Sequence, residues 1–79
     1  SSPKEQIYQQ LQKQSQYEHR LLNMISEQEE LLTNSAPQEK SYIKEKIAAL
    51  KIRYQKCNNY TQKLEFKLED IQDEWTKKQ

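Results

Sequence analysis

Few side chains in this sequence have the type and spacing that catalysis or metal binding requires. His19 is the only histidine and Cys57 the only cysteine, and neither has a second ligand nearby at the spacing of a zinc site. No base lies close to Cys57 in the sequence to activate it as a nucleophile. We therefore expect no metal site, and we interpret Cys57 as a small buried side chain.

The carboxylates and the missing glycine exclude two further kinds of site. The acidic residues lie on regular amphipathic segments that face water, so no cleft would shift the pKa of one carboxyl for acid–base catalysis. Loops that hold phosphates need glycine, and the chain has none. We expect no catalytic residues, no cofactor and no enzyme activity.

The composition indicates long helices. Only 33% of the 79 residues are hydrophobic, which is too little for a sizeable globular core. The absence of glycine and the two prolines are typical of helical rods. Regular spacing of the apolar residues argues against disorder. The chain begins without methionine, so we expect a segment of a longer protein.

The first helix is predicted over residues 3–32. Ser2 is a suitable N-cap, Pro3 suits the first helical position, and Glu5 can return a hydrogen bond to the cap. Polar residues interrupt the apolar seam of this segment, whose predicted members are Ile7, Leu11, Leu21, Ile25 and Leu32.

A turn is predicted over residues 33–36. Asn34 suits a left-handed helix end, and Ser35 can cap a second helix that has Pro37 in its first turn. This second helix, over residues 37–77, has apolar or small residues at alternating spacings of four and three, which indicates a coiled coil. Its seam comprises Ile43, Ile47, Leu50, Tyr54, Cys57, Thr61, Leu64, Leu68, Ile71 and Trp75.

These elements predict an all-α fold, an antiparallel two-helix coiled-coil hairpin that assembles further into a dimer or a four-helix bundle. Residues 1–39 carry a net charge of −3 and residues 40–67 one of +6, so the two helices attract each other. A fold near residues 34–36 places Leu21 opposite Leu50 and Tyr54 opposite the polar stretch from Gln14 to Glu18. One long parallel coiled coil is the alternative.

A candidate partner interface follows from this alignment. The first helix covers the second only to about residue 67, which leaves Leu68, Ile71 and Trp75 exposed as a hot spot or as the end of a truncated coil. Ile52 and Phe66 point away from the seam and could contact a further helix.

The basic run of residues 40–67 raises the question of nucleic acid. Phosphate binding needs only accessible cations, but these charges are distributed around the helix, and the formal net charge is only +1. We expect a solvated face rather than a nucleic-acid site. No segment has the length or hydropathy for membrane insertion, and the single cysteine fits a cytoplasmic protein, with a nuclear location left open.

The run Pro3-Lys4-Glu5-Gln6, followed by Leu11-Gln12 and a hairpin, resembles the HR1 repeats. These are antiparallel coiled-coil fingers that bind Rho-family GTPases, so the resemblance implies a small GTPase as partner. The residues alone favour a non-catalytic interaction and oligomerisation segment of an intracellular scaffold or regulatory protein. The HR1-like finger is the alternative.

Overall fold

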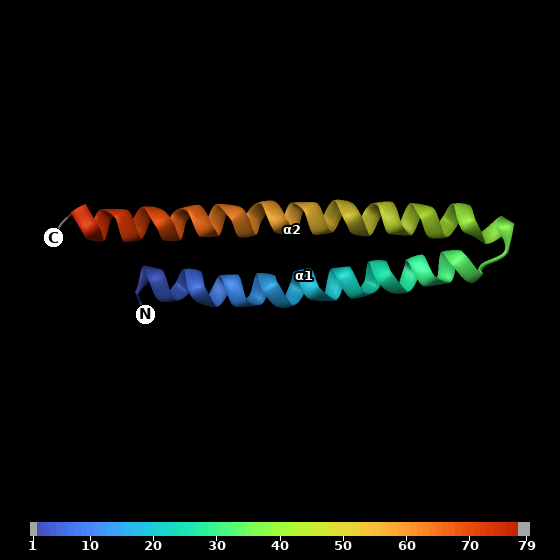
Figure 1. The fold of residues 1–79 in the computed structure, drawn as a ribbon, viewed down its shortest axis with the longest axis horizontal. Helices are drawn as coiled ribbons and strands as arrows, with labels where there is room; N and C mark the ends of the chain where they lie inside the picture. The colour runs from blue at the N-terminus through green and yellow to red at the C-terminus, as the bar shows by residue number, and fades with distance from the viewer. Residues whose placement is uncertain (1, 78–79) are drawn as a thin grey trace.

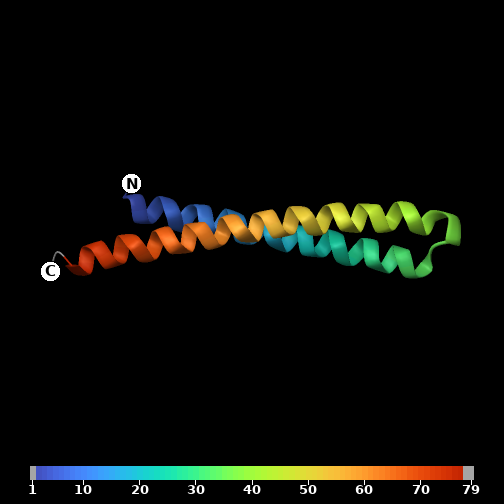
Figure 2. The same cartoon turned by 90° about the horizontal axis from the view of Figure 1, so that it is seen from above.

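Two long helices lie side by side and antiparallel in the computed structural model, which describes the backbone of residues 2–77 and the side chains of residues 2–72 (Figure 1). Helix α1 spans Pro3–Asn34 and α2 spans Pro37–Lys77. Seen from above, the helices cross at a shallow angle (Figure 2). This arrangement confirms the predicted all-α hairpin and excludes one long parallel coil.

Local hydrogen bonds explain where α1 begins and ends. Ser2 is its N-cap, and the Ser2 hydroxyl accepts from the Glu5 N–H at 3.2 Å. At the other end, Asn34 remains helical, and no described residue has positive φ. The expected left-handed turn is absent because Ser35 closes the helix in an extended conformation, with its hydroxyl donating to the Leu32 carbonyl at 3.0 Å.

The core is a single seam between the helices. Its buried side chains are Ile7, Leu21, Ile25, Ile43, Ile47, Cys57 and Leu64. Five further predicted seam positions are half-buried: Leu11, Leu32, Leu50, Tyr54 and Thr61. Each helix contributes one apolar stripe, and the opposite side of each helix faces water.

Two hydrogen bonds across the seam show how the helices are aligned. The Cys57 thiol donates to Gln14 Oε1, and Thr61 Oγ1 donates to Glu18 Oε1, both at 2.8 Å. Residue numbers rise in opposite directions along antiparallel helices, but both bonds join a lower number to a lower one and a higher to a higher one. The two bonds therefore run diagonally across the seam and cross each other. Gln14 therefore lies level with Thr61, and Glu18 lies level with Cys57.

This alignment differs by about one helical turn from the one expected from the sequence. When the observed alignment is continued along the seam, Leu21 lies level with Tyr54 rather than with Leu50. The physical reason is visible in Figure 1, where the first turn of α2 extends beyond the end of α1. The chain reversal uses part of α2, so α1 reaches further along α2 than a tight turn would allow.

The shift covers residues that were expected to be exposed. Leu68 and Ile71 are half-buried, and Ile71 lines a hollow together with Pro3 and Ile7 of α1. The predicted overhang is therefore wrong for these two residues. The Trp75 side chain lies outside the described residues.

Candidate binding groove

One edge of the hairpin carries a series of shallow hollows between the helices. If the seam residues are given heptad positions a and d, with Ile47 at a and Leu50 at d, the g positions of two antiparallel helices lie along the same edge. Three hollows follow this edge. We call it the basic groove, and its g positions are Pro3, Gln10, Tyr17 and Met24 on α1 and Lys46, Arg53, Tyr60 and Lys67 on α2.

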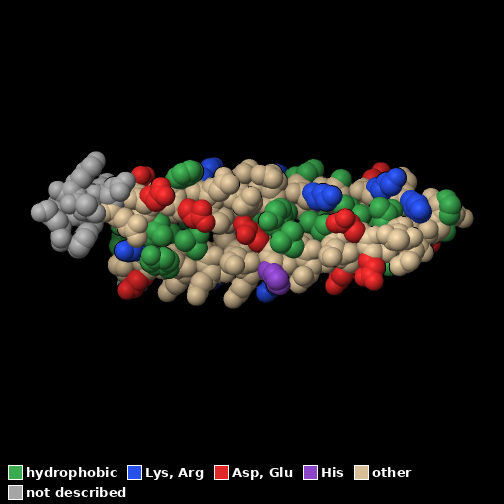
Figure 3. All heavy atoms as spheres, viewed as in Figure 1, with side chains coloured by type: hydrophobic (Ala, Val, Ile, Leu, Met, Phe, Trp, Pro, Cys, Tyr) green, Lys and Arg blue, Asp and Glu red, His purple; other side chains and the backbone are tan. Residues whose placement is uncertain are grey.

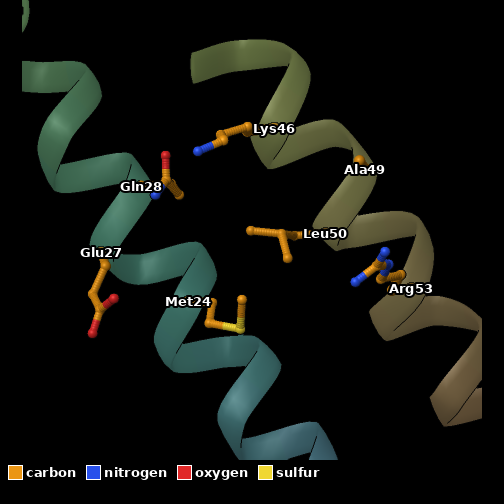
Figure 4. Close-up of a pocket in the computed structure, with 7 residues that line it drawn as sticks. All are labelled: Met24, Glu27, Gln28, Lys46, Ala49, Leu50 and Arg53. Atoms are coloured by element: carbon orange, nitrogen blue, oxygen red, sulfur yellow. The ribbon is translucent and has the colours of Figure 1, made fainter. Parts of the chain in front are cut away.

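The hollow nearest the turn encloses about 300 Å³. Figure 4 shows Leu50 pointing from α2 into the gap between the helices, with Met24 on the facing helix and Lys46 reaching across the upper part of the gap. Arg53 lies one heptad after Lys46 on the same edge of α2. This hollow therefore combines an apolar floor with two cationic side chains and one carboxylate, that of Glu27.

The middle hollow, of about 340 Å³, contains two tyrosines. Tyr17 comes from α1 and Tyr60 from α2, with 43% and 44% of their surfaces exposed. Arg53 and Lys56 also line this hollow, and Gln14 contributes to it from the seam. The end hollow contains Lys67 and the apolar side chains of Leu64 and Ile71.

Charge is distributed unevenly between the two sides of the hairpin. Within residues 2–72, the side with the groove, heptad positions c and g, has seven basic and three acidic residues: Lys13, Arg20, Lys46, Arg53, Lys56, Lys63 and Lys67 against Glu27, Glu39 and Asp70. The opposite side, positions b and e, has two basic and four acidic residues: Lys44 and Lys51 against Glu5, Glu29, Glu65 and Glu69. The basic residues of α2 are thus concentrated on the groove side.

Sequence reasoning missed this asymmetry because it counted charge along the chain. The signal was present, since the heptad positions of the lysines and arginines separate them into two sides. The tyrosines could not be paired from the sequence, because the alignment of the helices decides which turns of α1 and α2 meet.

The predicted interface residues do not form one surface. Ile52 and Phe66 are exposed at 59% and 63% and lie on the side of α2 away from the seam, whereas Leu68 and Ile71 are half-buried in it. On the face drawn in Figure 3, hydrophobic side chains form separate patches with charged side chains between them. The structure therefore separates residues that the prediction grouped.

The middle of the seam is polar. Gln14, Glu18, Cys57 and Thr61 lie together there, and burial together with the Glu18 charge raises the pKa of the Cys57 thiol from its ordinary value of 9.0. A raised pKa leaves little of the reactive thiolate near neutral pH. Within the described part of the chain, no group of His, Cys, Asp and Glu side chains could hold a metal ion.

Neither helix, over its described residues, is sufficiently long and apolar to cross a membrane. A family model matches most of the chain. The family model described as "Primosomal replication protein priC" matches residues 1–72. The chain belongs to this family. No curated protein and no solved structure matches the chain significantly.

Membership of the priC family corrects two hypotheses. The resemblance to the HR1 repeats is wrong, because the matching family is one of primosomal replication proteins. The function expected from it, binding of a Rho-family GTPase, is wrong for the same reason, and so is the function of an intracellular scaffold and oligomerisation segment. Long amphipathic helices with a heptad seam are common to many unrelated proteins, so the pattern alone could not separate these families.

Proposed function

We propose that the chain is a non-catalytic DNA-binding module that acts in primosomal replication in the cytoplasm and holds single-stranded DNA in the basic groove. The observation that carries this proposal is the coincidence, on one edge, of the hollows, the cations and two accessible tyrosines. Proteins that bind single strands combine a positively charged groove with aromatic side chains on which bases stack. The family description supports DNA as the ligand.

The spacing of the cations fits a flexible strand. Lys46, Arg53 and Lys67 occupy one edge of α2, and the helical rise of about 1.5 Å per residue places the first and the last about 30 Å apart. Lys56 lies beside the same path. A single strand can follow this path and bring successive phosphates to these side chains.

Duplex DNA fits the same surface less well. Base edges in a duplex are accessible only in the grooves, and the bases there are stacked on one another. Tyr17 and Tyr60 lie in a hollow between the helices and could contact only the sugar–phosphate backbone of a duplex. Unpaired bases can reach these side chains, so we expect single strands to bind more tightly than duplexes of the same length.

The test is fluorescence anisotropy with an oligothymidylate of about 12 nucleotides at about 0.05 M salt. Two double variants change the net charge equally: Arg53→Glu with Lys56→Glu on the groove side, and Lys44→Glu with Lys51→Glu on the opposite side. We expect the first pair to weaken binding at least tenfold and the second to have a much smaller effect. Equal losses would contradict a binding site in the groove.

A protein partner would need a different surface. The family description associates its members with the primosome, and Ile52 and Phe66 are exposed away from the seam. We therefore propose that these two side chains take part in protein contacts. Replacing both by serine should leave oligothymidylate binding unchanged, and a loss of DNA binding in a folded double variant would contradict this division of surfaces.

A further inference from the structure

We infer that the hollow between Tyr17 and Tyr60 is a nucleobase pocket, in which one unpaired base of the bound strand stacks on the tyrosine rings. This inference rests on the proposed function and names the part of the groove that recognises bases rather than phosphates. It also gives a role to two exposed aromatic side chains that the coiled-coil seam does not use.

The walls of the pocket are aromatic and come from both helices. Tyr17 and Tyr60 line the same hollow, and each keeps more than two fifths of its surface exposed. Neither ring has a hydrogen bond, ring contact or cation contact within the described part of the chain. Tyr42 differs, because the Lys46 ammonium lies 5.1 Å from its ring centre.

The floor of the pocket is polar. Gln14 and Cys57 line it from the seam, and the carbonyl of Gln14 accepts from the Cys57 thiol at 2.8 Å. With its carbonyl oxygen engaged by the thiol, the Gln14 side chain still has two amide N–H groups that can donate to a bound base. Such N–H groups can donate hydrogen bonds to the carbonyl oxygens of a pyrimidine or of guanine.

The rim of the pocket is cationic. Arg53 and Lys56 line the hollow beside the tyrosines and carry the charge that phosphates on either side of a stacked base require. The hollow of about 340 Å³ therefore offers aromatic walls, a hydrogen-bonding floor and phosphate-binding sides. The hollow at the open end also has a cation, Lys67, but no aromatic residue lines it.

The inference predicts that single tyrosine variants weaken binding through loss of stacking. Each variant removes one aromatic surface on which a base stacks, so Tyr17→Ala or Tyr60→Ala should each weaken oligothymidylate binding about tenfold. Tyr17→Phe and Tyr60→Phe should bind like the original chain, because the stacking surface is retained. Tyr8→Ala is the matched control, since Tyr8 is 48% exposed on the opposite side of the hairpin.

A second measurement separates bases from phosphates. An abasic oligonucleotide of the same length has the same phosphates and no bases, and it should compete at least tenfold less well than the oligothymidylate. Circular dichroism of each variant verifies that the helices form. Because both tyrosines are exposed, neither change should unfold the chain, and unfolding would contradict the placement of these side chains on the surface.

The outcomes distinguish the two proposals. If the original chain binds oligothymidylate and Arg53→Glu weakens binding while both tyrosine-to-alanine variants bind normally, the nucleobase pocket is wrong and the DNA-binding function stands. Equal competition by the abasic strand leads to the same conclusion. If the original chain binds no single-stranded DNA at low salt, both proposals are wrong.

Discussion

The hydroxyl of Thr61 lies 2.8 Å from Glu18 Oε1 across the seam and 3.1 Å from the carbonyl oxygen of Cys57 on its own helix. The hydroxyl has one proton, so it can donate to only one of these acceptors at a time. Thr61 therefore has a local alternative to its interhelical hydrogen bond, whereas Glu18 depends on Thr61. This difference between the two partners leads to the first prediction.

Removing Glu18 and removing Thr61 should have unequal effects on the free energy of unfolding. Glu18→Leu leaves Thr61 bonded to Cys57 and adds apolar surface to the seam, so the free energy of unfolding should stay the same or rise. Thr61→Val leaves the half-buried carboxylate without its donor and should lower the free energy of unfolding by about 1–3 kcal/mol. Urea unfolding monitored by circular dichroism measures both, and equal losses would show that the bond is not one-sided.

Leu21 and Leu22 provide a test of the seam at adjacent positions. Leu21 is 2% exposed and Leu22 is 45% exposed. Leu21→Ala should cost about 2–5 kcal/mol because it leaves a cavity in a thin core, which is enough to unfold a small hairpin. Leu22→Ala should change the free energy of unfolding by about 0.5 kcal/mol or less. Thermal melts measure both variants, and an equal fall in their midpoint temperatures would disprove this seam.

Alkaline pH should destabilise the hairpin through Cys57. Burial raises the pKa of this thiol in the folded chain above 9.0, so above about pH 9 the unfolded chain loses the proton more readily than the folded chain. Stability is therefore retained below the unfolded pKa and falls as pH rises toward the folded pKa. The Cys57→Ala variant has no thiol to titrate, so its free energy of unfolding should decline less between neutral and alkaline pH. The difference between the two pH profiles measures the contribution of the thiol.

The same burial should protect Cys57 from chemical modification. Thiol reagents attack the thiolate, and the buried thiol has both a raised pKa and little accessible surface. At pH 8 the folded chain should react far more slowly than the chain in urea. Equal rates in the two conditions would mean that the middle of the seam is open.

DNA binding should depend on salt in proportion to the cations that contact phosphate. Four contacts, from Lys46, Arg53, Lys56 and Lys67, predict a slope of about −3 for the logarithm of the binding constant against that of the salt concentration. Lys67→Gln should reduce the slope by about 0.7. Lys51→Gln, on the other side of α2, should leave it unchanged, and a salt-independent affinity would argue against phosphate contacts.

The sequence determined the elements and the faces of this protein. Alternating spacings of four and three select the residues of α2 that meet α1, from Ile43 to Leu64, and Ser2 begins α1 as its type and position predict. The heptad positions of the basic residues already divide them between two sides, although the linear charge count concealed it. These properties depend on local geometry and on the period of the helix, which a sequence carries directly.

Only the tertiary structure decided the alignment of the two helices. A heptad seam packs almost as well after a shift of one turn, because another seam position then takes the place of the first. The length of the chain reversal and the crossed bonds of Gln14 and Glu18 select one alignment. That selection covers Ile71 and brings Tyr17 and Tyr60 to the same hollow, which no spacing within either helix could specify.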